Sequence, residues 1–100
     1  LYPSKTLLLL CDMQEKFSKS ITHFNEIVDT SGRLTEAARL LNVPALITEH
    51  YPKGLGRTVD ELKKRAENAH VIEKTQFSMC TTDLLQYISK TIPDYESILL

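Results

Sequence analysis

The stretch Thr6-Leu7-Leu8-Leu9-Leu10-Cys11-Asp12-Met13-Gln14 decides the fold, because an apolar run ends abruptly on a carboxylate. The run is short for a helix, and its length fits a β-strand covered on both faces, as in a parallel sheet. Ligands of open α/β sheets bind beyond the carboxyl ends of the strands, which makes Asp12 a candidate functional residue. Its alternative role is to cap the turn that follows, since Asp is a preferred N-cap residue.

Two of the following segments have clear helix signals. Apolar residues mostly recur at helical spacing over 24–41, in a helix that Gly32 weakens without having to break it. Thr58 and Glu61 form a capping box, which predicts a second helix that runs to about Asn68.

The remaining elements complete an alternating pattern. A loop is predicted at 52–56, where one proline and two glycines occur, and a last helix at 83–90, after a cap by Thr81 or Thr82. The apolar residues of that helix are expected to face inward: Leu84, Leu85 and Ile88. Further strands are predicted at three places: 45–48, 71–72 and 98–100. Strands that alternate with helices indicate an α/β fold with a parallel sheet, and residues 1–100 form one domain.

Right-handed crossovers would bring the strand ends to one edge of this sheet, where Asp12, Glu49, His50 and Lys74 would gather. A Lys beside a partly buried carboxylate keeps its charge, and the carboxylate can then act as a general base. The alternative is a structural ion pair that joins two strand ends, because such pairs also perturb pKa values without catalysis.

The composition is that of an ordinary globular protein, with 42% hydrophobic and 25% charged residues. A net charge of −1 gives no electrostatic reason to expect nucleic acid or an anionic membrane as a partner. The longest apolar run, residues 7–11, is too short to span a bilayer. Two cysteines fit a reducing compartment, so we expect a cytoplasmic protein, with the mitochondrial matrix as the alternative. The chain stops in an apolar run, which predicts a longer protein.

Three motifs carry a family resemblance. The segments 10–17 (LCDMQEKF), 48–56 (TEHYPKGLG) and 73–79 (EKTQFSM) resemble, in this order, the isochorismatase-like hydrolase superfamily, and within it the eukaryotic isochorismatase domain-containing proteins. The resemblance covers about the first half of the family domain. It implies a three-layer α/β/α, Rossmann-like fold, of which this chain is the N-terminal portion, and a homo-oligomer, either a dimer or a tetramer.

The resemblance also implies a Cys-Asp-Lys triad. By motif match, Asp12 takes the place of the Asp that accepts the thiol proton, and Lys74 that of the Lys that favours the thiolate. The family's nucleophilic Cys follows the fourth strand, and therefore lies beyond residue 100. The implied function is a cysteine hydrolase that acts on a C–N bond (amide or imide) or an enol-ether bond of a small molecule.

Two other functions compete with this one. The first is a non-catalytic protein of the same fold, retained for binding or interaction. The second is a flavodoxin-like binding domain complete in about 100 residues. The non-catalytic protein and the enzyme differ in the residue at the nucleophile position, which follows the fourth strand in the longer protein. Ala, Ser or Gly at that position would exclude the enzyme.

Four residues are candidates for substrate binding. Phe17, Tyr51 and Phe77 follow the three strand ends and are placed to line a pocket for a flat, largely apolar substrate, with core packing as the alternative. Gln14 either hydrogen-bonds the substrate or holds its own loop.

Neither cysteine matches the family nucleophile. Cys11 precedes Asp12 on a strand, so it is expected to face away from Asp12 and to be a small buried apolar residue. Cys80 is expected near a helix start, where a thiol pKa can fall.

No metal and no cofactor are expected. Nicotinamidases of the superfamily bind a divalent metal through an Asp-x-His pair after the second strand, and the spacing around His50 does not match it. The segment 53–57 matches neither the phosphate loop nor the dinucleotide fingerprint.

Overall fold

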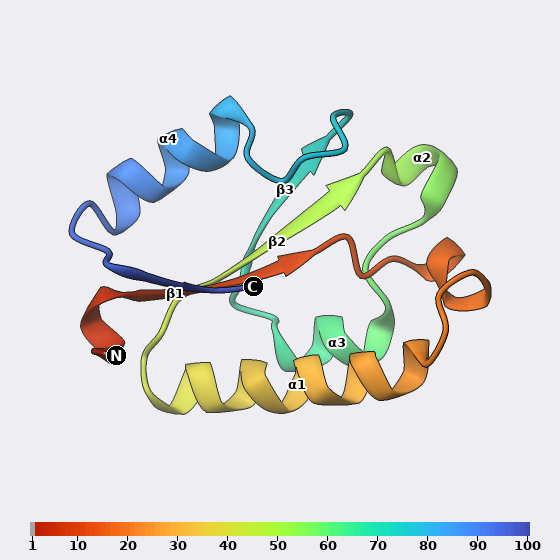
Figure 1. Cartoon of the computed structure of the whole chain (residues 1–100), viewed down its shortest axis with the longest axis horizontal. Helices are drawn as coiled ribbons and strands as arrows, with labels where there is room; N and C mark the ends of the chain where they lie inside the picture. The colour runs from red at the N-terminus through yellow and green to blue at the C-terminus, as the bar shows by residue number, and fades with distance from the viewer. Residues whose placement is uncertain (1) are drawn as a thin grey trace.

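The computed structural model describes residues 2–100, and it has a parallel sheet with helices on both faces (Figure 1). The strands are β1 (Thr6–Cys11), β2 (Ala45–His50), β3 (His70–Lys74) and β4 (Ser97–Leu99). The α-helices are α1 (Phe24–Leu40), α2 (Pro52–Leu55), α3 (Asp60–Arg65) and α4 (Thr82–Thr91), and the 3₁₀ helices are η1 (Pro3–Lys5) and η2 (Glu15–Lys19). The α/β fold with a parallel sheet that the sequence predicts is confirmed.

The strands lie in the order β3-β2-β1-β4, and all three neighbouring pairs are parallel. The chain therefore adds strands to one side of β1 and then returns to its other side. This is the beginning of the doubly wound order 3-2-1-4, whereas a flavodoxin-like sheet has the order 2-1-3-4. The flavodoxin-like interpretation is wrong for this reason. The reversal makes the crevice beyond β1 and β4 the expected ligand site.

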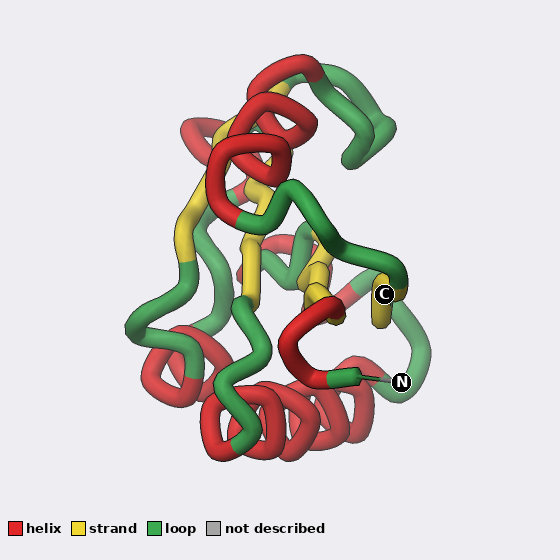
Figure 2. Tube along the Cα trace, turned by 90° about the vertical axis from the view of Figure 1, so that its left-hand side faces the viewer, coloured by secondary structure: helices red, strands yellow, loops and turns green. Residues whose placement is uncertain are grey.

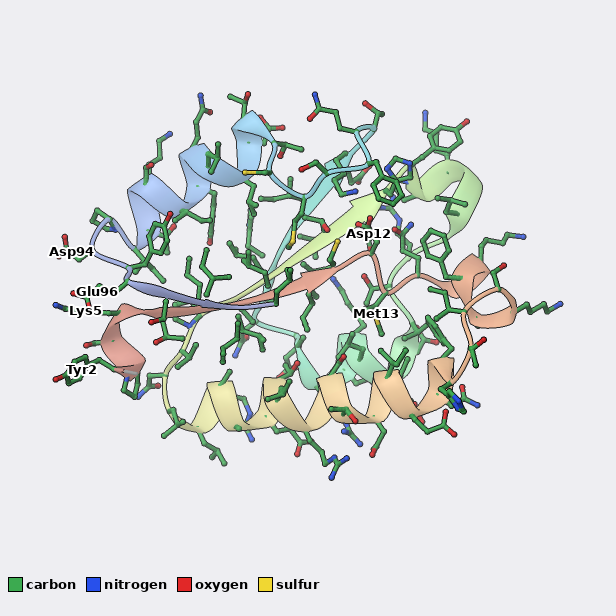
Figure 3. All side chains as sticks on the ribbon, in the orientation of Figure 1. Tyr2, Lys5, Asp12, Met13, Asp94 and Glu96 are labelled. Carbon is green, nitrogen blue, oxygen red and sulfur yellow. The ribbon has the colours of Figure 1, made fainter. Side chains whose placement is uncertain are left out.

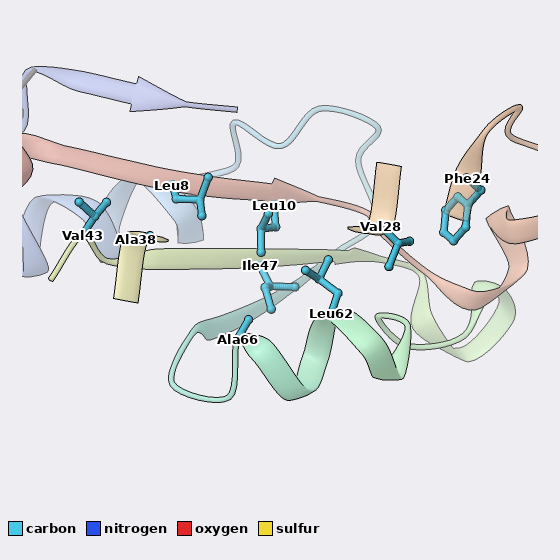
Figure 4. Packing of buried hydrophobic residues seen from close by; sticks show 9 residues of the cluster. All are labelled: Leu8, Leu10, Phe24, Val28, Ala38, Val43, Ile47, Leu62 and Ala66. Atoms are coloured by element: carbon cyan, nitrogen blue, oxygen red, sulfur yellow. The ribbon is translucent and has the colours of Figure 1, made fainter. Parts of the chain in front are cut away.

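The leucines of β1 build two separate cores. Leu8 and Leu10 pack with α1 and α3 on one face, and Leu7 and Leu9 pack with α4 on the other. Figures 1 and 2 show these two helical layers with the sheet between them. Figure 4 shows the first cluster, in which Ile47 is fully buried between the strands and α3. Burial on both faces explains why β1 is a continuous apolar run.

The helices differ from the sequence prediction in their inward faces. In α1 the buried residues include Gly32 and Thr35, while the apolar Ile27 and Leu34 are 40% and 47% exposed. In α4 the expected inward position of Leu84 is confirmed and that of Leu85 is wrong, since Leu85 is 47% exposed. None of the helices within residues 2–100 is long and apolar enough to cross a membrane.

The helix that was expected at 58–68 is shorter and begins differently. It occupies Asp60–Arg65, with Val59 at the N-cap, a residue whose side chain has no acceptor. The capping box is wrong because the Thr58 hydroxyl donates to Glu49 instead. The predicted loop at 52–56 contains the single turn α2, which Pro52 can begin because the first helical residue needs no N–H donor. For α4, the predicted cap by Thr81 is confirmed.

Candidate active site

Asp12 and Lys74 meet at the carboxyl edge of the sheet, as the sequence predicts. Lys74 Nζ donates to Asp12 Oδ2 at 2.8 Å. The Lys74 side chain is 1% exposed and that of Asp12 18%, so the ammonium is buried and the carboxylate reaches solvent. Figure 3 shows Asp12 just beyond the end of β1, at the opposite end of the sheet from Lys5 and Glu96.

The hydrogen bonds around this pair use all the donors of the ammonium. The other two N–H groups of Lys74 donate to the carbonyls of Gln76 at 3.0 Å and Phe77 at 3.1 Å. Asp12 Oδ1 accepts from the Thr48 hydroxyl at 2.8 Å. An ammonium has three donors, and all three of Lys74 are used. A carboxylate has about four acceptor sites, so Asp12 can still accept further hydrogen bonds.

The backbone of Asp12 explains how its carboxylate reaches the pair. Its φ is 53°, in the left-handed region that Asp tolerates better than most residues. This conformation ends the alternation of faces along β1 and directs the side chain toward Thr48 and Lys74. The predicted alternative, in which Asp12 caps the next turn, is wrong: η2 has Gln14 as its N-cap residue.

Gln14 holds the segment after β2 against the segment after β1. It is fully buried at 0% exposure. Its Oε1 accepts from the His50 N–H at 2.6 Å, and its Nε2 donates to the carbonyls of His50 at 2.9 Å and Gly56 at 2.8 Å. An isolated bridge to Thr58 adds to this connection. These contacts fit the second of the two roles that the sequence allows for Gln14, in which it holds its own loop.

Glu49 makes a second connection, which the sequence reasoning missed. Its carboxylate, 2% exposed, accepts from the N–H and the hydroxyl of Thr58, both at 2.8 Å, and from Arg57 Nη1 at 3.0 Å. Arg57 also donates to Glu73 at 2.9 Å. Burial alone raises the pKa of Glu49, but the hydrogen bonds from Thr58 and Arg57 outweigh it and hold that pKa below its usual value. The available signal was a Glu near the polar end of a strand that begins with apolar residues, followed closely by an Arg and a Thr.

A cavity of about 500 Å³ opens beside Lys74 at this edge. Tyr51, whose φ of 39° is also left-handed, lines the cavity. Phe17 packs partly buried against the first core cluster, and Phe77 is 92% exposed. The cavity is lined by residues of three segments: 51–53, 73–76 and 81–83.

The chain matches the isochorismatase domain over residues 6–96. Isochorismatase family protein 1A of Dictyostelium discoideum is 43% identical over an alignment that covers 100% of this chain and 50% of that protein. Isochorismatase domain-containing protein 2 of Xenopus laevis is 48% identical over an alignment that covers 95% of this chain and 45% of that protein. The structure of MAR1 ribonuclease from Caenorhabditis elegans superposes with a TM-score of 0.87 at 43% identity, covering 98% of this chain and 50% of that one.

The chain belongs to the isochorismatase family. The resemblance inferred from the three motifs is thereby confirmed. The chain spans about half the length of the relatives named above.

Cys11 occupies an unexpected place in this isochorismatase domain. It is exposed: β2 pairs with the end of β1, Cys11 lying opposite Thr48, but the ladder between β1 and β4 covers only residues 6–8 and leaves the other side of this end open. Desolvation by nearby side chains and the charge of Asp12 raise the pKa of the Cys11 thiol, against opposing effects of Thr48 and Lys74. The prediction of a buried residue is therefore wrong, and Asp12, Thr48 and Lys74 all act on the pKa of this thiol.

Cys80 lies where the sequence places it. It is exposed and directly precedes Thr81, the N-cap residue of α4, and its amide donates to Ser78 Oγ at 3.0 Å.

The histidines of this domain are engaged separately. His50 Nδ1 lies 3.1 Å from the Gln76 carbonyl, and His70 stacks on Tyr87 at a centroid distance of 4.0 Å. Over the described residues 2–100, no group of three or more His, Cys, Asp or Glu is arranged to hold a metal ion. The absence of a metal stays a prediction.

Proposed function

We propose that this isochorismatase domain is part of a cysteine hydrolase that cleaves a C–N bond (amide or imide) or an enol-ether bond of a small molecule. Asp12 is the base, Lys74 its electrostatic partner, and the nucleophilic Cys lies beyond residue 100. The observation that carries the proposal is the Asp12–Lys74 contact of 2.8 Å, with an ammonium that is 1% exposed.

The hydrogen bonds support different roles for the two residues. Asp12 has acceptor capacity left and is 18% exposed, so it can take the proton of an approaching thiol. The thiolate then attacks the substrate carbon, and the proton on Asp12 passes to the leaving nitrogen or oxygen. Water afterwards cleaves the bond between the substrate carbon and the sulfur, which releases the second product and restores the thiol. Lys74 has no donor to spare, and its role is to hold the Asp12 carboxylate in place and to supply the opposite charge beside it.

The sheet topology supports a nucleophile that follows β4. β4 pairs with β1 in parallel, so the chain that leaves β4 emerges at the same edge as Asp12. The strand order also reverses at this point, where doubly wound sheets bind their ligands.

The class of substrate follows from charge and size. A cavity of about 500 Å³ beside Lys74 suits a small organic molecule. The net charge of −1 favours such a substrate over a polyanion. The Caenorhabditis elegans relative is named a ribonuclease, so RNA belongs among the compounds to be tested. We further propose that the protein is a homo-oligomer, that it binds no metal and no cofactor, and that it lies in a reducing compartment.

The test is a screen of primary amides, cyclic imides, enol ethers and a short RNA with the full-length protein. We expect hydrolysis of a small molecule, and a loss of about 100-fold or more in kcat for Asp12→Asn. Lys5→Met is the matched control, because Lys5 forms an exposed ion pair with Glu96 far from the site. Cleavage of RNA alone, or activity that survives Asp12→Asn, would contradict the proposal.

The runner-up is a non-catalytic binding protein of the same fold. The observation that favours it is that Lys74 is fully satisfied by Asp12 and two carbonyls, as in a structural ion pair. The residue after β4 in the longer protein separates the two: a Cys supports the hydrolase, and Ala, Ser or Gly supports the binding protein.

A further inference from the structure

The carbonyl of Gln76 is shared between two side chains. Lys74 Nζ donates to it at 3.0 Å, and His50 Nδ1 lies 3.1 Å from the same oxygen. A carbonyl oxygen only accepts, and its two lone pairs allow both bonds at once. Nδ1 of His50 must therefore carry the hydrogen, which leaves Nε2 as an acceptor whenever the ring is neutral.

His50 is itself held firmly in place. Gln14, which is fully buried, bonds both its N–H and its carbonyl. His50 also stands opposite Lys74 in the register of β2 and β3. The contacts close a ring: Asp12 and Gln14 belong to one segment, Gln14 fixes His50, and His50 and Lys74 meet at the Gln76 carbonyl.

We propose that His50 is a positioning residue for the Asp12–Lys74 pair and acts through the carbonyl of Gln76. The inference rests on the proposed function in that the pair is taken to activate a thiol. Gln76 lies in the irregular segment 75–81, whose carbonyls are not fixed by a helix or a strand. The Nδ1–H of His50 anchors the carbonyl of Gln76, so that one N–H group of Lys74 has a fixed acceptor, which helps to direct another N–H group at Asp12.

A different role for His50 makes a different prediction. If His50 were a base that worked through Nε2, any residue without a basic nitrogen would abolish its effect. If it works through the Nδ1 hydrogen, a residue with a donor at the same place retains it. Asn offers an amide N–H close to the position of Nδ1, whereas Leu has a similar size and no donor.

The experiment compares His50→Asn and His50→Leu in the full-length protein. His70→Leu is the matched control, because His70 begins β3, the strand that ends on Lys74, and stacks on Tyr87 away from the pair. The probe is iodoacetamide, with the alkylation rate of each cysteine resolved by mass spectrometry. We expect the proposed nucleophile beyond residue 100 to react about tenfold more slowly in His50→Leu, and within twofold of the wild type in His50→Asn and His70→Leu.

Hydrogen exchange tests the positioning without any activity. Amides of the segment 75–81 should exchange faster in His50→Leu than in the wild type, His50→Asn or His70→Leu. Ring ¹⁵N spectra of the wild type should show the hydrogen on Nδ1 of His50. An unchanged exchange rate in His50→Leu, a hydrogen on Nε2 alone, or His50→Asn behaving as His50→Leu would overturn the proposal. If no cysteine beyond residue 100 reacts while exchange changes as expected, the positioning stands and the hydrolase function falls.

Discussion

At the scale of single residues, the two members of the central ion pair differ in exposure, and therefore in what their removal costs. Asp12→Asn leaves the ammonium of Lys74, 1% exposed, without its counter-charge, which costs about 3–5 kcal/mol of unfolding free energy. Lys74→Met keeps an apolar stem and leaves a carboxylate that is 18% exposed, so we expect a smaller cost of about 1–3 kcal/mol. Urea unfolding of both variants and of the double variant measures these costs.

The double variant should lose less stability than the sum of the two single ones, because it leaves no unpaired charge. Lys5→Met is the control: its ion pair with Glu96 is 45% and 57% exposed, and its loss should stay within about 0.5 kcal/mol. Equal costs for Asp12→Asn and Lys74→Met would show that burial does not set the energetics of the pair.

Glu49 should make stability depend on pH. Its pKa in the folded chain lies below the ordinary value of 4.5, because the bonds from Thr58 and Arg57 favour the charged form. Its contribution is therefore complete above the pKa of the unfolded chain and is lost as pH falls through the folded pKa. Urea unfolding should show a constant difference between wild type and Glu49→Gln from pH 7 to 5, and a shrinking one below pH 4.5. A difference that stays constant down to pH 3 would contradict this assignment.

At the scale of elements, Gly32 shows that the sequence of one helix alone does not predict the effect of a substitution on stability. A Cβ at Gly32 would lie 2.3 Å from Arg65 Nη1 and 2.7 Å from its Cδ, because Arg65 of α3 crosses α1 at this point. Arg65 passes there to reach Asp29 and Glu36, at 3.9 and 3.6 Å. The side chain is 35% exposed, so it can move away at the cost of these ion pairs.

Gly32→Ala should therefore give no net stabilisation in the wild type, although helix propensity alone favours Ala by about 1 kcal/mol. In an Arg65→Ala background the obstacle is absent, and the same substitution should stabilise by about 1 kcal/mol. Thermal or urea unfolding of the four proteins measures the difference. A gain of equal size in both backgrounds would mean that Arg65 does not restrict this position.

The two predicted helix caps give a second test at this scale. The hydroxyl of Thr81 accepts from the Leu84 amide at 3.2 Å, so Thr81→Ala should destabilise by about 1 kcal/mol. Glu61→Ala should change stability by no more than about 0.5 kcal/mol, because Thr58 bonds Glu49 rather than forming a capping box. Equilibrium unfolding measures the loss of stability in both variants. If Glu61→Ala cost about as much as Thr81→Ala, the capping box of Thr58 and Glu61 would be present after all.

The same elements show what sequence patterns can and cannot predict. The strands were predictable because a strand buried on both faces leaves a continuous apolar run, as at Leu7 to Leu10. The inward face of α1 was not, because it includes Gly32 and Thr35, whose burial depends on Arg65 and on α3 rather than on hydropathy. Thr58 satisfied the local rule for a cap, but a buried carboxylate from another strand took its hydroxyl.

At the scale of the whole molecule, topology determines the site. Asp12 and Lys74 are 62 positions apart, and they meet because the strands are parallel and therefore all end at one edge. This part of the site could be predicted from the order of elements alone. The roles of Gln14 and His50 could not, because they depend on side-chain hydrogen bonds to backbone groups, which leave no periodic signal.

The sheet order also places β4 at an edge, where Ile98 and Leu99 are 45% and 38% exposed. Apolar edge strands pair with other chains, so residues 1–100 expressed alone should self-associate, and Ile98→Lys should reduce this because a charge on an edge opposes pairing. Light scattering with size-exclusion chromatography measures the mass of residues 1–100 with and without the Ile98→Lys substitution. A monomer that unfolds cooperatively without the substitution would contradict the prediction. In the longer protein, Ile98→Lys should lower Tm if further chain covers this edge, since it would then bury an unpaired ammonium.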